Sequence, residues 1–287
     1  MHLLIPTHKR PKKLRALLNS ILNAESLEVI KRIYIIENGS SSAERIANSF
    51  SDRLPIQYLH RAEGNKSKAL NAALENIPAE ALLLFFDDDI LVDKNLFRSY
   101  AEVCPRFGPG HYFGGGHRPN YEITPDPRLV PYFPRSNRFS DLAGEAELKL
   151  FPAFQEFLGF NWACYHRDLI NIGGFSPDFG PGSASGARGQ ETDAQYRLYE
   201  NGVKAVAIGD AKVDHFVPAK YISEDWLVER IFLSSMHLGK EKSSFMKSLG
   251  LLVKLQFSWL QILLGNNSIG PRYRIAKAAG YFKGLIS

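Results

Sequence analysis

Cysteine, methionine and tryptophan are scarce in this sequence: its 287 residues include two cysteines, three methionines and three tryptophans. Cys104 and Cys164 alone cannot form a disulfide framework, so the sequence suits a reducing compartment. No basic stretch followed by a long apolar run stands near the N-terminus, and we therefore expect no secretory signal. Neither G-x-x-x-x-G-K-S/T nor G-x-G-x-x-G after a strand occurs, which excludes the common glycine-rich phosphate loops.

Acidic side chains are almost absent from the C-terminal part. From Lys240 onward there are eight basic residues and one acid, Glu241, which leaves 27 basic and 29 acidic side chains in the first 239 residues. The net charge of +5 therefore belongs to the C-terminal segment alone. A diffuse nucleic-acid-binding surface would not be distributed in this way, and we expect no nucleic-acid partner.

Short apolar segments alternate with helical patterns through the first ninety residues. We expect strands over residues 2–6, 32–36, 56–59 and 81–86, and helices over 11–23, 43–50 and 66–75. This alternation predicts an α/β fold with a doubly wound parallel sheet. Further along, we expect loops around one strand near 111–115 within residues 105–140, and two strands over 204–208 and 212–216.

Three adjacent carboxylates, Asp87, Asp88 and Asp89, directly follow the apolar segment 81–86. Ligands of open α/β sheets bind at the carboxyl ends of the strands. Neighbouring carboxylates repel one another unless a cation is present, and Mg²⁺ or Mn²⁺ takes oxygen ligands while leaving positions for substrate phosphates. The triplet therefore predicts a metal and phosphate site, with a solvated acidic turn as the alternative.

A second acidic cluster opens a predicted helix. Residues two apart on a helix point about 200° apart, so Glu191 and Asp193 cannot both face one site. One of them is a candidate catalytic carboxylate; the alternative is that both are partners of the helix dipole. The glycine-rich residues 180–189 predict a loop near the site. His215 ends an expected strand beside Asp214 and is a candidate metal ligand, although a lone histidine is more often structural.

Six motifs lie along roughly residues 2 to 217: Ile5 through Pro11, Ile36 through Ser40, Lys66 through Asn71, Asp87 through Asp89, Gly173 through Phe175, and Glu191 through Leu198. In this order and spacing, they together resemble the family 2 glycosyltransferases with a GT-A fold. The segment from Tyr281 to Gly284 is similar to the closing segment of many bacterial members.

The resemblance implies a Rossmann-like, mostly parallel sheet flanked by helices, followed by a C-terminal helical appendage. It implies a catalytic domain over residues 1–217, with a nucleotide-binding half over about 1–103 and an acceptor half over about 104–217. Residues 218–287 would then form a helical, basic and amphipathic segment.

The resemblance also implies how the donor is bound. Pro6, Thr7 and Arg10 would line the nucleotide pocket. Glu37 would contact the base or ribose, and Lys66 would meet the nucleotide.

The acidic triplet receives separate roles from the same resemblance. Asp87 would reach the ribose or ligand waters, and Asp88 would belong to the same donor-binding set. Asp89 would bind the divalent metal, Mn²⁺ or Mg²⁺. His215 is the candidate further ligand from its place at a strand end, not from the resemblance.

Glu191 falls on the family's general base, and Asp193 is the other catalytic candidate. Two departures from the family pattern stand out. Gln190-Glu191 occupies the place where the family usually has Glu-Asp, and His8-Lys9 the place where it more often has Tyr-Asn.

These features predict an enzyme that moves a sugar from a nucleoside-diphosphate sugar, with a UDP-sugar favoured, to an acceptor hydroxyl in polysaccharide or glycolipid synthesis. A metal would stabilise the leaving diphosphate, and one base opposite the leaving group would give inversion. A sugar nucleotidyltransferase remains an alternative, although residues 6–11 lack its expected glycine-rich signature. An inactive nucleotide-sugar-binding partner is another, although it would be expected to have lost the acids.

Aromatic residues gather before the Gly173-Gly174-Phe175 motif, on the side where the acceptor is expected. Trp162 is the candidate acceptor contact, because Asn161 and Ala163 interrupt any continuous apolar face. Core packing is the alternative, above all for the neighbouring aromatics Phe157 and Phe160.

Residues 240–264 predict one helix with a narrow basic stripe and a wide apolar surface. Lys240, Lys247, Lys254 and Gln261 are seven apart, so they drift by only about 20° per step. These polar residues disfavour a membrane-spanning helix and favour one lying in the interface. Basic residues that could add attraction to anionic headgroups are Arg272, Arg274, Lys277 and Lys283. We expect a cytoplasmic protein held peripherally at the inner face of the membrane; packing on the catalytic domain or a homodimer contact is the alternative.

Overall fold

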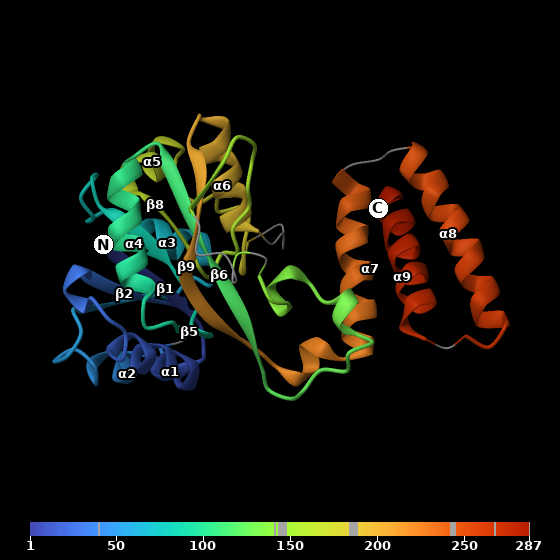
Figure 1. Ribbon diagram of the computed structural model, residues 1–287, viewed down its shortest axis with the longest axis horizontal. Coiled ribbons are helices and arrows are strands. Elements are labelled where there is room, and N and C mark those ends of the chain that lie inside the picture. The colour runs from blue at the N-terminus through green and yellow to red at the C-terminus, as the bar shows by residue number, and fades with distance from the viewer. Residues whose placement is uncertain are drawn as a thin grey trace. The chain divides into compact units, whose positions relative to one another are not determined.

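The computed structural model describes residues 1–39, 41–140, 142, 148–183, 189–241, 245–266 and 268–286. The chain divides into two compact units (Figure 1). The first comprises Met1–Asn120 and Phe139–Phe216, and the second comprises Tyr121–Arg138 and Val217–Ser287. Our expected boundary after residue 217 lies next to this division, whereas residues 121–138, which we expected in the catalytic domain, belong to the second unit.

One mixed sheet forms the centre of the first unit. Its parallel half contains, in order, β3 (Ile56–Arg61), β2 (Arg32–Asn38), β1 (His2–Thr7) and β4 (Leu82–Phe85). The order continues with β8 (Trp162–Tyr165), β6 (His111–Tyr121), β9 (Lys204–Val217) and β5 (Ile90–Val92), while β7 (Leu148–Phe151) pairs with β9. The pairs β4–β8, β6–β8, β5–β9 and β7–β9 are antiparallel. The predicted α/β class with a Rossmann-like parallel half is confirmed.

Helices flank this sheet in the first unit. They are α1 (Pro11–Leu22), α2 (Glu44–Asn48), α3 (Lys66–Leu74), α4 (Leu96–Phe107), α5 (His166–Asn171) and α6 (Gln190–Glu200), with a 3-10 turn at Leu27–Val29. Two predictions from sequence were wrong here. Pro105, expected in a loop, lies in the last turn of α4. The strands expected over 204–208 and 212–216 are one strand, because β7 pairs with its first part and β5 with its last.

The second unit is helical. It contains α7 (Glu224–Glu241), α8 (Phe245–Leu263) and α9 (Ile269–Leu285), with 3-10 turns at Val130–Tyr132, Arg135–Asn137 and Ala219–Ile222. Within it α9 lies between α7 and α8, as Figure 1 shows. The single helix expected over 240–264 is wrong, since α7 ends at Glu241 and α8 begins at Phe245. Among the described helices, none combines the length and apolar character needed to cross a membrane.

Helices α7 and α9 approach each other closely because glycines stand at their contact. A Cβ added to Gly280 would lie 2.1 Å from the carbonyl oxygen of Phe232, and one added to Gly284 would lie 2.0 Å from that of Met236. These distances leave no room for any side chain, so the α7–α9 pair depends on glycine at both positions.

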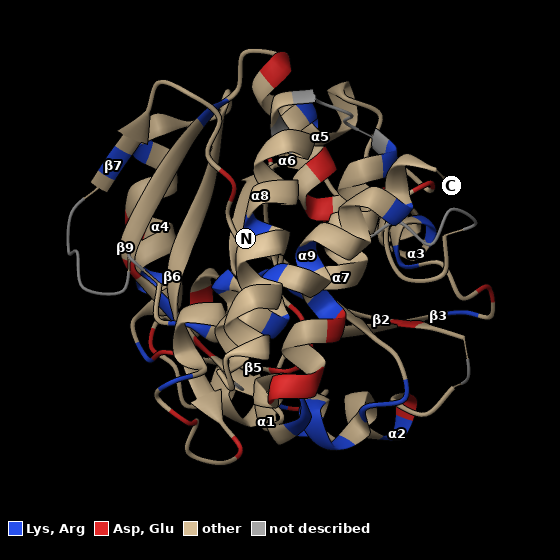
Figure 2. Ribbon diagram, turned by 90° about the vertical axis from the view of Figure 1, so that its right-hand side faces the viewer, with Lys and Arg blue, Asp and Glu red and all other residues tan. Residues whose placement is uncertain are grey.

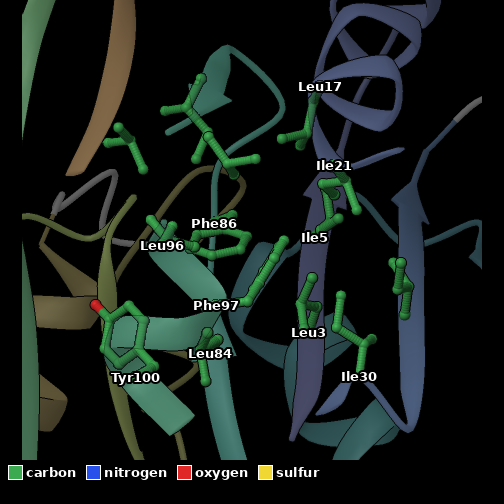
Figure 3. Close-up of a cluster of buried hydrophobic side chains, with 14 of the residues drawn as sticks. Leu3, Ile5, Leu17, Ile21, Ile30, Leu84, Phe86, Leu96, Phe97 and Tyr100 are labelled. Atoms are coloured by element: carbon green, nitrogen blue, oxygen red, sulfur yellow. The ribbon is translucent and has the colours of Figure 1, made fainter. Parts of the chain in front are cut away.

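Apolar residues of β1 alternate between the two faces of the sheet, as expected of a strand covered on both sides. Leu3 and Ile5 point into a core formed with α1 and α4, where Ile21 and Phe97 also lie (Figure 3). Leu4 belongs to the opposite core, which α3 covers. All of these side chains are fully or almost fully buried, and each contributes about 1.5–3 kcal/mol by leaving water. This double core fixes the strand ends from which the candidate site is built.

Candidate functional site

A pocket of about 460 Å³ lies at the carboxyl ends of the parallel strands. Thr7 ends β1, Asn38 ends β2, and the acidic triplet follows β4. The pocket is lined by Pro6, Thr7, His8, Arg10, Asn38, Gly64, Lys66, Asp87, Asp88, Asp89, Pro181, Gly182 and His215. Eight of the residues singled out from the sequence therefore meet around one cavity: Pro6, Thr7, Arg10, Lys66, Asp87, Asp88, Asp89 and His215.

Asp88 is the most buried member of the triplet, with 3% of the residue exposed. The Thr7 hydroxyl donates to its Oδ2 at 2.7 Å, and Arg10 donates to its Oδ1 at 3.1 Å. Burial raises the pKa of Asp88 above its ordinary value, although Thr7 and Arg10 oppose that shift. Asp88 thus ties the ends of β1 and β4 together behind the pocket.

Asp89 faces two basic side chains from the start of α1. Arg10 Nη1 lies 3.0 Å and Lys13 Nζ 3.2 Å from its Oδ2. Together with Lys66, these residues supply the positive charge that three adjacent carboxylates require. The sequence argument assigned that compensation to a bound cation and missed Lys13. The spacing of Lys13 from Arg10 is a usable signal, because residues three apart lie on the same side of a helix.

Lys66 connects the two acidic clusters. Its ammonium lies 2.8 Å from Asp87 Oδ1 and 2.8 Å from Glu191 Oε1. Burial would lower the pKa of Lys66, but the two carboxylates outweigh it and raise that pKa. Burial would likewise raise the pKa of Asp87, but Lys66, His215 and Arg10 hold it below its ordinary value. The Lys66 ammonium thus lies between two carboxylates that come from segments far apart in the chain.

Glu191 is held from two further sides. Gln190 donates to its Oε1 at 2.7 Å, and Gly159 packs against its carboxyl group. A Cβ at position 159 would lie 2.7 Å from the Glu191 carboxyl carbon. Gly159 is therefore a functional candidate that the sequence did not indicate.

Asp193 has a different environment from Glu191, as the helical spacing required. It accepts two hydrogen bonds from Arg197, at 2.9 and 2.7 Å. Arg197 also donates to the carbonyl oxygens of Ile172 and Gly174. Asp193 thus belongs to a group of contacts that holds the Gly173-Gly174 turn, and it does not line the pocket.

His215 lies beside Asp89, with 3.9 Å between His215 Nε2 and Asp89 Oδ1. The imidazole stacks on the Phe160 ring, with ring centres 4.4 Å apart. Both side chains line the pocket and are of types that bind Mn²⁺, so they are the ones that would hold a divalent ion there. Over the described ranges, no group of three or more His, Cys, Asp or Glu side chains could hold a metal. Solvent or substrate phosphates would have to complete the coordination.

Glu37 lies outside the pocket and is completely buried. Its carboxylate accepts hydrogen bonds from the Ser42 amide and hydroxyl, the Ala43 amide and the Tyr58 hydroxyl, all between 2.6 and 2.8 Å. Burial would raise the pKa of Glu37, but these donors together lower it. Burial and the Glu37 carboxylate raise the pKa of Tyr58 to about 12. Glu37 therefore holds the loop after β2 and has no carboxylate edge turned to the pocket.

Trp162 is fully buried, and this position removes it from the surface where we expected an acceptor contact. Its ring stacks on Phe85 at 4.5 Å. The expectation rested on Asn161 as a break in the apolar face. Asn161 is itself buried, because Tyr100 and two backbone carbonyl groups satisfy its amide. Phe157 is also in the core, and Phe160 supports His215.

The rim of the pocket depends on a close backbone contact. A Cβ on Gly182 would lie 1.4 Å from the Gly64 carbonyl oxygen, and Gly182 has φ of +83°. The Lys66 amide donates to Pro181 at 3.1 Å on the same side. The predicted loop over 180–189 thus contributes Pro181 and Gly182 to the site, while its residues 184–188 lie outside the described part of the chain.

The parallel half of the sheet carries this pocket, β9 brings His215 to it, and α6 brings Glu191 to Lys66 at its edge, in the architecture of the GT-A fold. Residues 3–163, more than half of the chain, match the model of Glycosyl transferase family 2, and the protein belongs to that family. No curated protein matches the sequence.

Solved structures share this fold at low sequence identity. They include the mannosyltransferase PcManGT from Pyrobaculum calidifontis with GDP-Man and Mn²⁺ (TM-score 0.55, 15% identity, covering 99% of this chain and 72% of that one). S. aureus TarS 1-349 with UDP-GlcNAc has a TM-score of 0.53 at 12% identity, covering 99% of this chain and 90% of that one. GalNAc-T7 with UDP, GalNAc and Mn²⁺ has a TM-score of 0.57 at 12% identity, and the match covers 85% of this chain and 51% of that one. This chain thus spans about half of GalNAc-T7, and only 43% of a longer TarS structure.

Proposed function

We propose that this protein is a metal-dependent, inverting glycosyltransferase that moves a hexose from a nucleoside-diphosphate sugar to an acceptor hydroxyl. The observation that carries this proposal is the Asp87–Lys66–Glu191 bridge at the edge of the pocket. It joins the acids that follow β4, where donor phosphates would bind, to the carboxylate best placed to act as base. The three neighbours described above contain UDP or a nucleotide sugar, two of them with Mn²⁺, which supports the donor class.

Donor binding would use the pocket's own charges. Asp89 and His215 would hold a divalent ion, which neutralises charge on the leaving diphosphate when bound. Arg10, Lys13 and Lys66 are the cations near the same place, and each now pairs with a carboxylate. Diphosphate oxygens would compete for these cations, so Arg10 and Lys66 would bind the leaving group as its charge grows.

Glu191 would take the proton from the acceptor hydroxyl. Its Oε1 now accepts from both Lys66 and Gln190, which orients the carboxylate and compensates its charge. A carboxylate that remains paired with an ammonium is a weaker base, so we infer that the Lys66–Glu191 pair lengthens when the donor engages Lys66. Attack by the activated hydroxyl opposite the leaving group would give inversion.

The substrate side of the proposal is broader. We favour a UDP-sugar as donor and a carbohydrate or lipid-linked acceptor, in polysaccharide or glycolipid synthesis. We also propose a cytoplasmic protein that binds the membrane peripherally through its C-terminal unit. A homodimer is the alternative to membrane binding, and an inactive nucleotide-sugar-binding protein is the alternative to the enzyme. Both alternatives are tested below.

A panel of nucleotide sugars tests this function directly. Full-length protein would be incubated with UDP-, GDP- and other nucleotide sugars and Mn²⁺, and the release of nucleoside diphosphate would be measured. We expect one donor class to be hydrolysed slowly and only with the metal. Binding without any turnover, with or without acceptor oligosaccharides, would favour the inactive partner instead.

A further inference from the structure

The outward side of α8 is mostly apolar, with the exposed Gln256 as a polar interruption. Its large apolar residues with 45% to 80% of their area exposed are Met246, Leu249, Leu252, Val253, Phe257, Trp259, Leu260 and Leu263. At about 100° per residue they cover an arc of about 160°. Leu251 and Ser258, on the opposite side, are buried in the second unit. We call this arc the α8 apolar face.

A groove of about 400 Å³ lies between α8 and α9 at the edge of this face. Its apolar lining is Leu251, Val253, Phe257 and the Tyr273 ring, and its cations are Lys254, Arg274 and Lys277. The groove therefore combines hydrocarbon walls with three basic side chains from two helices.

The three cations of the groove have no carboxylate partner within the described parts of the chain. Arg274 donates to the Ser258 hydroxyl at 2.8 Å and to the Gln261 amide oxygen, which are neutral groups. Arg272, two residues away, is different because it pairs with Glu224 and Asp225. We expected Arg272 to be among the headgroup-binding cations, but its side chain is paired with two carboxylates of the second unit.

No acidic residue occurs anywhere from residue 242 to residue 287. Figure 2 shows the consequence, since the ribbons of α8 and α9 carry blue positions but no red ones. A partner for the groove must therefore bring negative charge, and a partner for the α8 apolar face must bring hydrocarbon. An anionic phospholipid bilayer supplies both at once.

We propose that the α8–α9 groove binds the phosphate headgroup of an anionic phospholipid while the α8 apolar face lies in the bilayer interface. This rests on the peripheral membrane association proposed above and assigns it to particular residues. A second copy of the chain fits less well, because a two-fold contact through α8 would bring the same unpaired cations together without an acid to face them.

Vesicle sedimentation with the full-length protein tests the assignment. The vesicles are phosphatidylcholine alone or mixed with phosphatidylglycerol. The test variant is Lys254→Gln with Lys277→Gln, and the matched control is Lys94→Gln with Lys204→Gln, two exposed lysines of the first unit. We expect the test variant to lose about thirtyfold in partitioning onto the anionic vesicles, the loss expected for two cations near such a surface. The control should keep the wild-type value.

A second variant, Phe257→Ser, separates hydrocarbon contact from charge. Phe257 is 57% exposed, so its loss should leave the melting temperature unchanged while reducing binding to both kinds of vesicle. Nucleotide binding is measured separately without vesicles, so a failure of the sugar-transfer proposal leaves the vesicle result readable.

Four outcomes would overturn the proposal. If the wild type binds neither vesicle, the membrane association itself is wrong. Equal binding by the wild type and the Lys254/Lys277 variant would mean that the protein binds membranes but not through the groove. Release of the protein by soluble glycerol phosphate would mean that the groove takes free phosphate esters. A stable solution dimer that dissociates on Phe257→Ser would place a second copy on this face.

Discussion

The two units of the molecule differ in whether the basic side chains of their sites are paired with carboxylates. In and beside the pocket of the first unit, Arg10, Lys13 and Lys66 each lie about 3 Å from a carboxylate, so charge is concentrated but compensated. In the α8–α9 groove, Lys254, Arg274 and Lys277 face no carboxylate among the described residues. Cations that are paired with carboxylates can exchange those partners for the phosphates of a substrate. Cations without a carboxylate partner can instead bind an anion from outside the chain. On the two proposals made above, the first site carries out chemistry and the second binds a membrane.

Asp89 is the position where breaking the compensated site should have the largest effect. Removing its carboxylate in Asp89→Ala takes away the partner of Arg10, Lys13 and His215 together. We expect sugar transfer to fall to background while the fold survives, because Asp89 lies at the pocket edge. Turnover assays and thermal melts check this. Full activity in the folded variant would remove Asp89 from the metal site.

Glu191→Gln should have the next largest effect. The amide cannot accept the acceptor's proton, so turnover should fall by about 10²- to 10⁴-fold while donor affinity changes little. Asp193→Asn is the control, because Asp193 pairs with Arg197, whereas Glu191 pairs with Lys66 of the pocket. A dead Asp193→Asn enzyme beside an active Glu191→Gln enzyme would exchange the two roles.

Gly159→Ala should disturb the same carboxylate without removing it. The new methyl group would come within 2.7 Å of the Glu191 side chain, which is free to turn aside while the backbone stays in place. A displacement of about 1 Å costs up to about 10²-fold in rate, so we expect a smaller loss than for Glu191→Gln. Gly250→Ala, where no atom lies within 4 Å of the added carbon, is the control. Equal kcat values for both variants would mean that Gly159 does not position the base.

Glu37→Gln should affect stability more than catalysis. The amide replaces a buried carboxylate with four donors around it, which we expect to cost about 1–3 kcal/mol of unfolding free energy. Because folding lowers the pKa of Glu37, its contribution is present above the unfolded pKa of about 4.3 and is lost as pH falls through the folded pKa. Urea titrations of both proteins should therefore differ most near neutral pH and converge in acid. A constant difference down to acid pH would contradict this.

Local patterns in the sequence predicted the parallel half of the sheet and most of the pocket. Short apolar runs mark β1, β2 and β4, whereas β3 is mixed, and the ends of β1, β2 and β4 lead into Thr7, Asn38 and the acidic triplet. In the antiparallel half, β6 and β9 were expected in part, but β5, β7 and β8 were missed, because they have only three or four residues and depend on partners far away in the chain. Periodicity cannot indicate such pairings.

The expectations for two individual side chains depended on tertiary contacts in a related way. Glu37 and Trp162 were chosen from motif position and from their immediate neighbours, but tertiary contacts decide their roles. Four donors around Glu37 and the stacked Phe85 ring against Trp162 come from packing that no short window contains. Lys66 and Glu191 meet across 125 residues, and only the fold could show that they form one bridge.

The most direct test of the central claim is calorimetry of nucleoside diphosphate binding to the pocket. UDP and GDP would each be titrated into the full-length wild type and into Asp89→Ala, with Mn²⁺ or with a chelator. We predict binding of one nucleotide by the wild type with Mn²⁺, and little or none with the chelator or in the variant. Equal affinity in all conditions, or no binding of any nucleotide, would contradict the account.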